Sequence, residues 1–341
     1  MQRHPTGLVT FLAAFMLLPA ISANATAVPR LQLEQLVTAS DVIMVGQVDS
    51  PQFSHTATTQ LAGEIVQTRV FRVKVTVLRL LKGKDAGVAV VTYELPSYRT
   101  LGYRPVDTGT RLLFLRRSGE GLTPTDPYYP SLPASTSEPG SSGSDPLDGV
   151  IVVLGTVLAS DAESPVVKEQ ILDVAYAIPP NAAFTQSLRR GLDTSDPDLR
   201  YRVMGNLIRR HDREVLPAAV KALLKADFQE RHRSMIEYAI RTSVDEPSAV
   251  PVLIPLVRSG YASTRSAVLE AFWHIGTWSV IPSATAVLTD PDQDTRYYAV
   301  RALAAATGEL IWGPSIPEFK DHESKYIQHW EDWAKTHPHS D

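Results

Sequence analysis

Four regularly placed arginines constrain the fold of this chain more than any other feature: Arg200, Arg231, Arg265 and Arg296, spaced by 31, 34 and 31 residues. Each begins one pattern, with an apolar or small residue three and four positions later and a larger apolar residue seven positions later. That spacing marks one helix face, and a period of this length is typical of stacked helix pairs. The positions are Val203, Met204 and Leu207; Ser234, Met235 and Tyr238; Val268, Leu269 and Phe272; and Ala299, Val300 and Leu303.

A second helix is predicted between successive arginine helices. Proline recurs there at Pro217, Pro251 and Pro282. Proline suits the first turn of a helix, where its missing N–H would have no partner in any case. The Asp-Pro-Asp segments at 196–198 and 290–292 supply cap chemistry and negative charge to two of the arginine helices.

The segment Leu288–Leu303 resembles the HEAT-repeat family, with its pattern of Leu, Asp-Pro, Arg, Ala and Leu. The resemblance covers roughly Ala183–Gly308, and it implies an α-solenoid over residues 179–310. It also implies that the four repeat arginines are structural, forming a ladder with the aspartates of neighbouring repeats. The second repeat departs from the pattern, because Phe228–Arg231 lacks the Asp-Pro turn.

The N-terminal half carries strand signals instead. Residues 66–81 alternate between apolar and polar side chains, which predicts a half-exposed strand, and a short helix is expected at 31–37. Several short strands separated by turns predict a small barrel or sandwich over residues 28–178. The other expected strands are Asp41–Val48, Val88–Tyr93, Thr110–Arg116 and Val150–Val157.

Residues 118–148 are rich in Pro, Ser, Gly and Thr. Such a composition cannot bury enough apolar surface to become ordered, so we predict a disordered loop inserted between two strands. A linker between domains is the alternative, but the expected strand Val150–Val157 would then lack a partner.

Three segments of the N-terminal half, Leu36–Val48, Val75–Gly83 and Gly109–Leu115, resemble the OB-like β-barrel of tissue inhibitors of metalloproteases. The resemblance covers about Leu31–Arg116. Those inhibitors chelate a protease zinc through an N-terminal Cys, and this sequence has no Cys, so that mechanism does not carry over. OB folds also bind oligosaccharides and oligonucleotides, although a fold alone does not fix function.

The first 27 residues are predicted to be a secretory signal peptide: Arg3, an apolar run from Leu8 to Ile21, then overlapping Ala-x-Ala sites that place cleavage after Ala25 or Ala27. A membrane anchor is the alternative, but the run is shorter than the about 20 residues that a span needs. The protein is therefore expected to be secreted or periplasmic, with no integral span after cleavage. The net charge of −4 argues against nucleic acid as a partner.

Residues 311–341 are predicted to close the repeat array. An amphipathic helix is expected at Asp321–Lys335, with Tyr326, Ile327, Trp330, Trp333 and Ala334 on one face. A terminal repeat needs such a cover over its apolar side. A ligand-stacking platform is the alternative for these aromatic residues.

No complete active site is recognisable in the sequence. It contains no nucleophile elbow, metalloprotease motif or phosphate-binding loop, and Gly140–Gly143 lies in the expected loop. Carboxylates that glycoside chemistry would require as a pair, including Glu237, Asp245, Glu246 and Glu270, are expected at helix surfaces or turns. The late histidines His322, His329, His337 and His339 are expected to be solvated. We predict no enzyme activity, no metal and no cofactor.

A group of arginines in the first repeat is the one candidate binding site. Bidentate arginines suit carboxylates, so these side chains could recognise an acidic protein partner. The alternative is a solvated face with contacts to the N-terminal domain. The candidates are Arg189, Arg190, Arg202, Arg209, Arg210 and Arg213.

The sequence thus predicts an exported interaction or scaffold protein whose oligomeric state it leaves open. A hydrolase or hydrolase inhibitor of the cell envelope, acting on proteases or polysaccharides, is the second hypothesis. A purely structural role in envelope assembly is the third.

Overall fold

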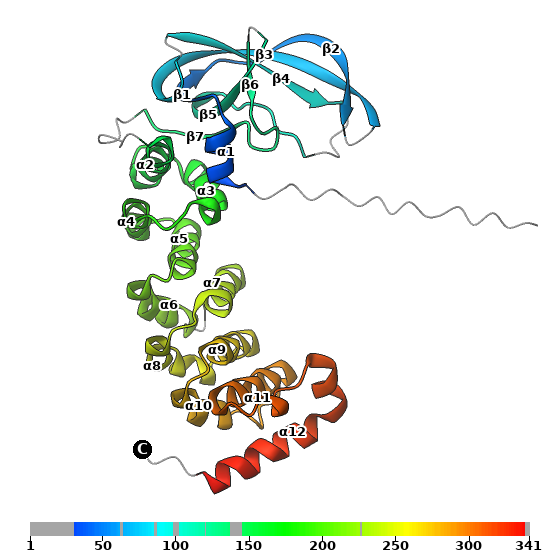
Figure 1. Ribbon diagram of the computed structural model, residues 1–341. Coiled ribbons are helices and arrows are strands. Elements are labelled where there is room, and N and C mark those ends of the chain that lie inside the picture. The colour runs from blue at the N-terminus through cyan, green and yellow to red at the C-terminus, as the bar shows by residue number, and fades with distance from the viewer. Residues whose placement is uncertain are drawn as a thin grey trace, which may run out of the picture.

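The computed structural model describes residues 31–61, 64–84, 87–97, 102–119, 121–136, 145–225 and 227–337. A mixed β-sheet comes first, and a row of helices follows it down to the C-terminal helix (Figure 1). The expected signal peptide lies outside the described residues. Within them, no helix combines the length and the apolar character needed to span a bilayer.

Seven strands form the sheet, in the order β1-β3-β4-β6-β5-β7, with β2 paired to β3. β1 also pairs with β5, so the pairings β1-β3-β4-β6-β5-β1 return to their starting strand. Four strands and the short helix α1 (Leu33–Ala39) fall where the sequence predicted them. The strands are β1 (Val42–Val48), β2 (Gln52–Leu61), β3 (Glu64–Lys82), β4 (Val88–Pro96), β5 (Gly109–Ser118), β6 (Gly121–Pro124) and β7 (Ser131–Pro133).

Strands β1 and β5 are buried on both faces. Met44 and Leu113 point into a core that belongs to the sheet alone. Their neighbours Ile43 and Phe114 point the other way, into a core shared with the helices. Because side chains alternate along a strand, this double burial accounts for the unbroken apolar runs at 42–45 and 112–115.

The predicted strand Val150–Val157 is wrong, because this segment lies within helix α2 (Pro146–Ala159). Asp145 caps the helix by accepting a hydrogen bond from the Leu147 N–H, with proline at the first position. The helix is buried on most sides between the sheet and its neighbours, so its apolar run carries no periodic signal that separates it from a strand. The helical part therefore begins at Pro146 rather than at residue 179.

The predicted disordered loop at 118–148 is also wrong for residues 121–136. Strands β6 and β7 lie within it, and Leu122, Leu132 and Ala134 are buried. Short strands that add to an existing sheet obtain their hydrogen bonds and apolar contacts from neighbours. The composition of the segment alone does not show this.

The helices form two layers (Figure 1). α2, α4, α6, α8 and α10 lie in one layer, and α5, α7, α9 and α11 follow α3 in the other. The bounds are α3 (Pro165–Val174), α4 (Ala182–Arg190), α5 (Pro197–Arg209), α6 (Leu216–Leu223), α7 (Glu230–Ser243), α8 (Val250–Leu253), α9 (Ala262–Ile275), α10 (Ile281–Thr285), α11 (Gln293–Thr307) and α12 (Ile316–Thr336).

Three of the predicted repeat arginines are structural, and each makes the same contact. Arg200, Arg265 and Arg296 each donate to the backbone carbonyl six residues earlier, that of Thr194, Ser259 and Asp290. Each is the fourth residue of its helix. Arg265 also pairs with Asp290 at 2.7 Å and Arg296 with Glu323 on α12. The carbonyl contacts tie each of the three helices to the turn before it, and the two ion pairs also tie α9 and α11 to the unit that follows.

Arg231 does not occupy the equivalent place in the second repeat. The fourth residue of α7 is Arg233, which is buried and donates to the carbonyls of Leu223, Lys225 and Phe228. The repeat spacings are therefore 33, 32 and 31 residues. The core positions counted from Arg233 are Ile236, Glu237 and Ile240, and all three are buried. Of the residues predicted for the core, Ser234 and Tyr238 are exposed and Met235 is half-buried.

The C-terminal helix covers the last repeat with aromatic side chains, as expected. The predicted helix Asp321–Lys335 lies within α12, where Trp330 is fully buried and Trp333 nearly so. The indole of Trp330 donates to the Trp312 carbonyl at 3.3 Å. His329, expected to be solvated, is half-buried and stacks on Trp312 with ring centroids 3.7 Å apart.

Candidate binding cavity on the helical layer

Two of the candidate arginines are used to connect turns. Arg189 donates to Asp212 at 2.7 and 3.0 Å and pairs with Glu214 at 3.0 Å. Arg213 pairs with Glu246. In each case hydrogen bonding to the carboxylate raises the pKa of the arginine.

Arg210 holds the connection between α3 and α4. Its guanidinium donates to the carbonyls of Ala175, Ile178 and Pro179 at 3.0, 2.9 and 3.3 Å and lies over the Phe184 ring. Burial lowers its pKa, because the charged form loses solvation. Arg210 is therefore structural.

Arg190, in contrast, is exposed at the end of α4, and no hydrogen bond or ion pair joins it to another described residue.

Arg202 and Arg209 come together at a cavity of about 420 Å³ between α3, α5 and α7. They are seven residues apart and so share one face of α5. Asn206 lies between them and donates to the Arg202 carbonyl at 3.0 Å. The other lining residues are Leu172, Asp173, Tyr176, Gly205, Ser234, Met235 and Tyr238.

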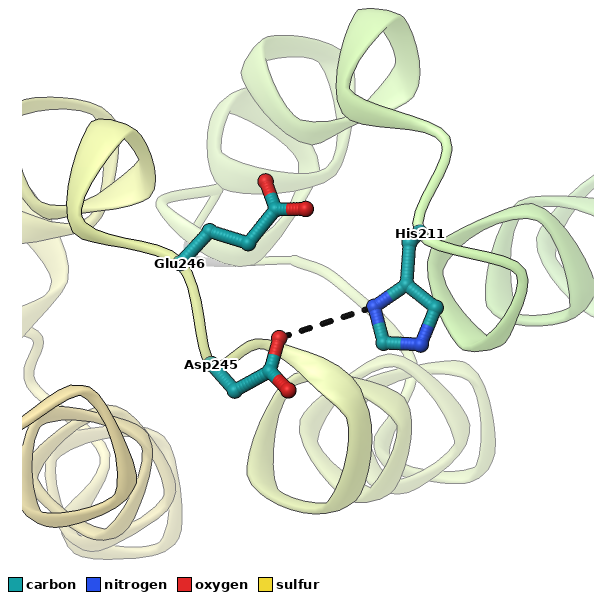
Figure 2. Close-up of side chains that lie close together, drawn as sticks. All are labelled: His211, Asp245 and Glu246. Atoms are coloured by element: carbon teal, nitrogen blue, oxygen red, sulfur yellow. Dashed lines mark ion pairs between the residues drawn. The ribbon is translucent and has the colours of Figure 1, made fainter.

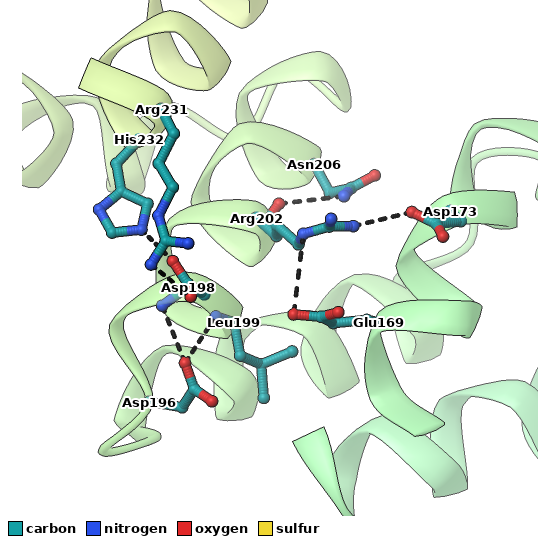
Figure 3. Close-up of polar contacts among 9 residues, drawn as sticks. All are labelled: Glu169, Asp173, Asp196, Asp198, Leu199, Arg202, Asn206, Arg231 and His232. Carbon is teal, nitrogen blue, oxygen red and sulfur yellow. Dashed lines mark hydrogen bonds and ion pairs between the residues drawn. The ribbon is translucent and has the colours of Figure 1, made fainter. Parts of the chain in front are cut away.

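Arg202 is already paired across the cavity. It donates to Asp173 of α3 at 2.8 Å and lies 3.9 Å from Glu169 (Figure 3). The side chain of Asp173 is 65% exposed, and Asp173 lies in the last turn of α3, where the helix dipole disfavours a negative charge. A pair of this kind contributes little to stability and can be exchanged for another carboxylate.

Arg209 remains available. No hydrogen bond or ion pair joins it to another described residue. Its side chain is exposed, yet enough protein surrounds its guanidinium to lower its pKa by desolvation, an effect that the nearby Tyr238 phenol partly offsets. A partly desolvated cation without a carboxylate partner is favourably placed to bind an anion.

The corrected repeat register explains why the cavity lies at this repeat. Gly205 is five residues after the repeat arginine, where the next three repeats carry Tyr238, Glu270 and Arg301. Its missing side chain leaves room between α5 and α7. A Cβ at Gly205 would lie 3.6 Å from the Met235 carbonyl oxygen, which is ordinary van der Waals contact, so only a side chain longer than alanine would begin to fill this space.

A polar cluster beside the cavity fixes α5 against α7 (Figure 3). Asp198, in the first turn of α5, accepts from Arg231 at 2.7 Å and contacts the buried ring of His232. The hydrogen bond to His232, together with the charge of Arg231, lowers the pKa of Asp198. His232 lies against Tyr201, with ring centroids 4.8 Å apart. The cavity walls are thus held by contacts on both sides.

Of the four carboxylates weighed for glycoside chemistry, Asp245 and Glu246 lie together beside His211, whereas Glu237 and Glu270 lie apart from them. Glu237 is buried rather than on a surface, and it accepts from the hydroxyls of Ser263 and Thr264. Glu270 is half-buried beside Arg241. Asp245 and Glu246 lie near His211, with His211 Nδ1 3.6 Å from Asp245 (Figure 2). Arg213 already neutralises Glu246. The three residues therefore connect the turn after α5 to the turn after α7.

Comparisons with known proteins leave the chain without an assigned family. No protein-family model matches it, and neither does any curated protein. Among solved structures, it is similar to the crystal structure of an engineered protein, with 17% identity over 47% of this chain and 81% of that one, at a TM-score of 0.37. A likeness this weak carries no argument about function.

Proposed function

We propose that this protein is an exported, non-catalytic interaction or scaffold protein that binds an acidic segment of a partner protein. In this proposal the two helical layers form a HEAT-type α-solenoid, and the sheet is an OB-like barrel at its N-terminal end. The recurring arginine-to-carbonyl contact and the circuit of strand pairings support these two assignments. The signal-like N-terminus supports secretion or a periplasmic location.

One observation carries the binding proposal: Arg209 lines a cavity on the helical layer with no carboxylate partner among the described residues. The carboxylate of a partner side chain would complete a charge-assisted pair there, with Asn206 and Tyr238 alongside. The alternative function, a hydrolase acting on envelope polysaccharides, gains no such support. Among the described residues that line the cavity on the sheet, Glu94 is the one carboxylate, whereas glycoside hydrolysis generally uses two.

Quantitative affinity capture from an envelope extract tests the proposal with a matched pair of variants. Arg209→Ala removes the cavity cation, and Arg190→Ala removes the same charge from α4 outside the cavity. We expect a specific partner to be lost with Arg209→Ala and retained with Arg190→Ala. An identical set of captured proteins for wild type and both variants would argue against the proposal.

A further inference from the structure

The helical cavity is one of three that adjoin each other. A second cavity, of about 310 Å³, lies where α3 meets the sheet. It shares Asp173 with the helical cavity. A third, of about 530 Å³, lies on the sheet and shares Arg104 and Pro130 with the second. The shared lining residues make the three cavities neighbours along one path from α7 to the sheet.

This path crosses a well-packed junction. The shared apolar core runs from β1 and β5 through α1 and α2 into the helical layers. Polar contacts reinforce it: the Leu31 N–H donates to the Tyr176 hydroxyl at 2.9 Å, and Arg111 reaches Gln170 at 3.5 Å. The sheet cavity and the helical cavity are therefore held in a fixed relation.

The sheet end of the path is cationic. Arg104, Arg116 and Arg117 line the sheet cavity against one carboxylate, Glu94. Glu94 accepts hydrogen bonds from Thr59 at 2.6 Å and Thr68 at 3.0 Å. The exposed side chain of Arg116 has no hydrogen bond or ion pair with another described residue.

The remaining walls of the sheet cavity provide rings and hydroxyls. Tyr93 and Tyr103 line it, and burial raises the pKa of both phenols, so they stay neutral. Neutral aromatic rings provide apolar contact for the backbone or side chains of a bound chain. The path thus has an available arginine at each end, Arg209 on the helices and Arg116 on the sheet.

We propose that the three cavities form one groove that binds an extended acidic polypeptide segment. This inference rests on the proposed function and adds the partner's form: carboxylates at two separated places, one at Arg209 and one at Arg116. Three cavities of this size in a row span on the order of 20–25 Å, or about seven extended residues. Of the acidic residues along the groove, Asp173 is paired with Arg202, Asp107 lies 3.7 Å from Arg111, and Glu94 accepts hydrogen bonds from two threonine hydroxyls.

Fluorescence anisotropy with labelled oligoglutamates of three and ten residues tests the groove, using the full mature chain. The variants are Arg209→Ala, Arg116→Ala, their combination, and Arg190→Ala as the charge-matched control. For the ten-residue probe, we expect each single variant to weaken binding about tenfold, the two effects to multiply, and the control to bind as wild type. The three-residue probe reaches one end at a time, so each single variant should change its binding by no more than about twofold.

The outcomes distinguish the proposed function, binding at the helical cavity, from the further inference of one continuous groove. If Arg209→Ala weakens the long probe and Arg116→Ala does not, the groove is wrong and the helical cavity alone binds. If Arg116→Ala alone acts, or if neither variant acts, both proposals fail. Equal losses for all three single variants would indicate a non-specific charge effect and overturn the groove. Because Arg116, Arg190 and Arg209 are exposed, unchanged melting curves should accompany all of these measurements.

Discussion

A buried polar network marks the second repeat at the scale of single residues. Glu237 stands in the core position that Met204, Leu269 and Val300 fill in the other repeats. It is accommodated because Thr264 donates to it, while Thr264 also accepts from Arg233 at 3.3 Å. A buried carboxylate without such donors would be strongly unfavourable. The network therefore makes the packing of α7 on α9 specific to this pair of helices.

Tyr298 of α11 gives a pH-dependent prediction at this scale. Burial, and then the charge of Glu270, raises its pKa from the ordinary value of 10.0 to about 12. The folded state therefore holds this proton more tightly than the unfolded chain, so its contribution to stability is complete below pH 10 and is lost as the pH rises towards 12. The difference in absorbance at 295 nm between wild type and Tyr298→Phe should rise near pH 12. Glu270→Gln should move that rise to lower pH. A difference already complete at pH 11 in the wild type would contradict the assignment.

The second repeat shows, at the scale of elements, how one missing turn motif misplaces a helix. The Asp-Pro turns give α5 and α11 a capping aspartate, Asp196 or Asp292, with its side chain accepting backbone N–H groups. α7 has Gln229 at this place and no side-chain cap. α9 also lacks a side-chain cap, but Arg265 is the one arginine in its first turn. In α7 both Arg231 and Arg233 fall in the first turn, and only burial distinguishes them.

A matched pair of variants tests this register. Arg233 is 2% exposed, donates to three carbonyls and lies 3.3 Å from the Tyr261 ring centroid. Arg233→Ala should lower the free energy of unfolding by about 3 kcal/mol or more, because buried acceptors lose their donor. Arg231 makes an exposed ion pair with Asp198, so Arg231→Ala should cost less than about 1 kcal/mol. Urea denaturation measures the free energy of unfolding of both variants. Equal losses would contradict the assignment of Arg233, rather than Arg231, as the repeat arginine of α7.

Elements with a clear period were predictable from the sequence, and only some of those without one were. The alternating residues of β3 lie where they were expected, and so does β1, whose apolar run has no period but is short enough for a buried strand. α2 was mistaken for a strand because burial on most of its sides leaves no polar face to reveal the helical period. Likewise, the crowding of arginines along the sequence did not show which of them meet in space. The separation of seven residues between Arg202 and Arg209, with Gly205 between them, was the signal that could have found the cavity.

At the scale of the whole molecule, the described residues form two apolar cores that meet at β1 and β5. One lies within the sheet, and the other runs from these strands through α1 and α2 to α12. A sheet attached through a linker alone would leave the outer faces of β1 and β5 exposed, whereas here Ile43, Val45 and Phe114 are buried. The sheet and the helices thus share apolar surface, which is what keeps the sheet cavity aligned with the helical cavity.

Two neighbouring residues of β5 test this division. Leu113 and Phe114 are both fully buried, but Leu113 lies in the core of the sheet and Phe114 in the core shared with the helices. Leu113→Ala should cost about 2–5 kcal/mol and Phe114→Ala about 3–5 kcal/mol. Hydrogen exchange should distinguish them, because opening is local to the core that is damaged. Faster exchange is expected in β3 and β4 for Leu113→Ala, and in α1, α2 and α3 for Phe114→Ala. If both variants accelerate exchange in the same segments, the sheet and helices form one cooperative core and the division into two is wrong.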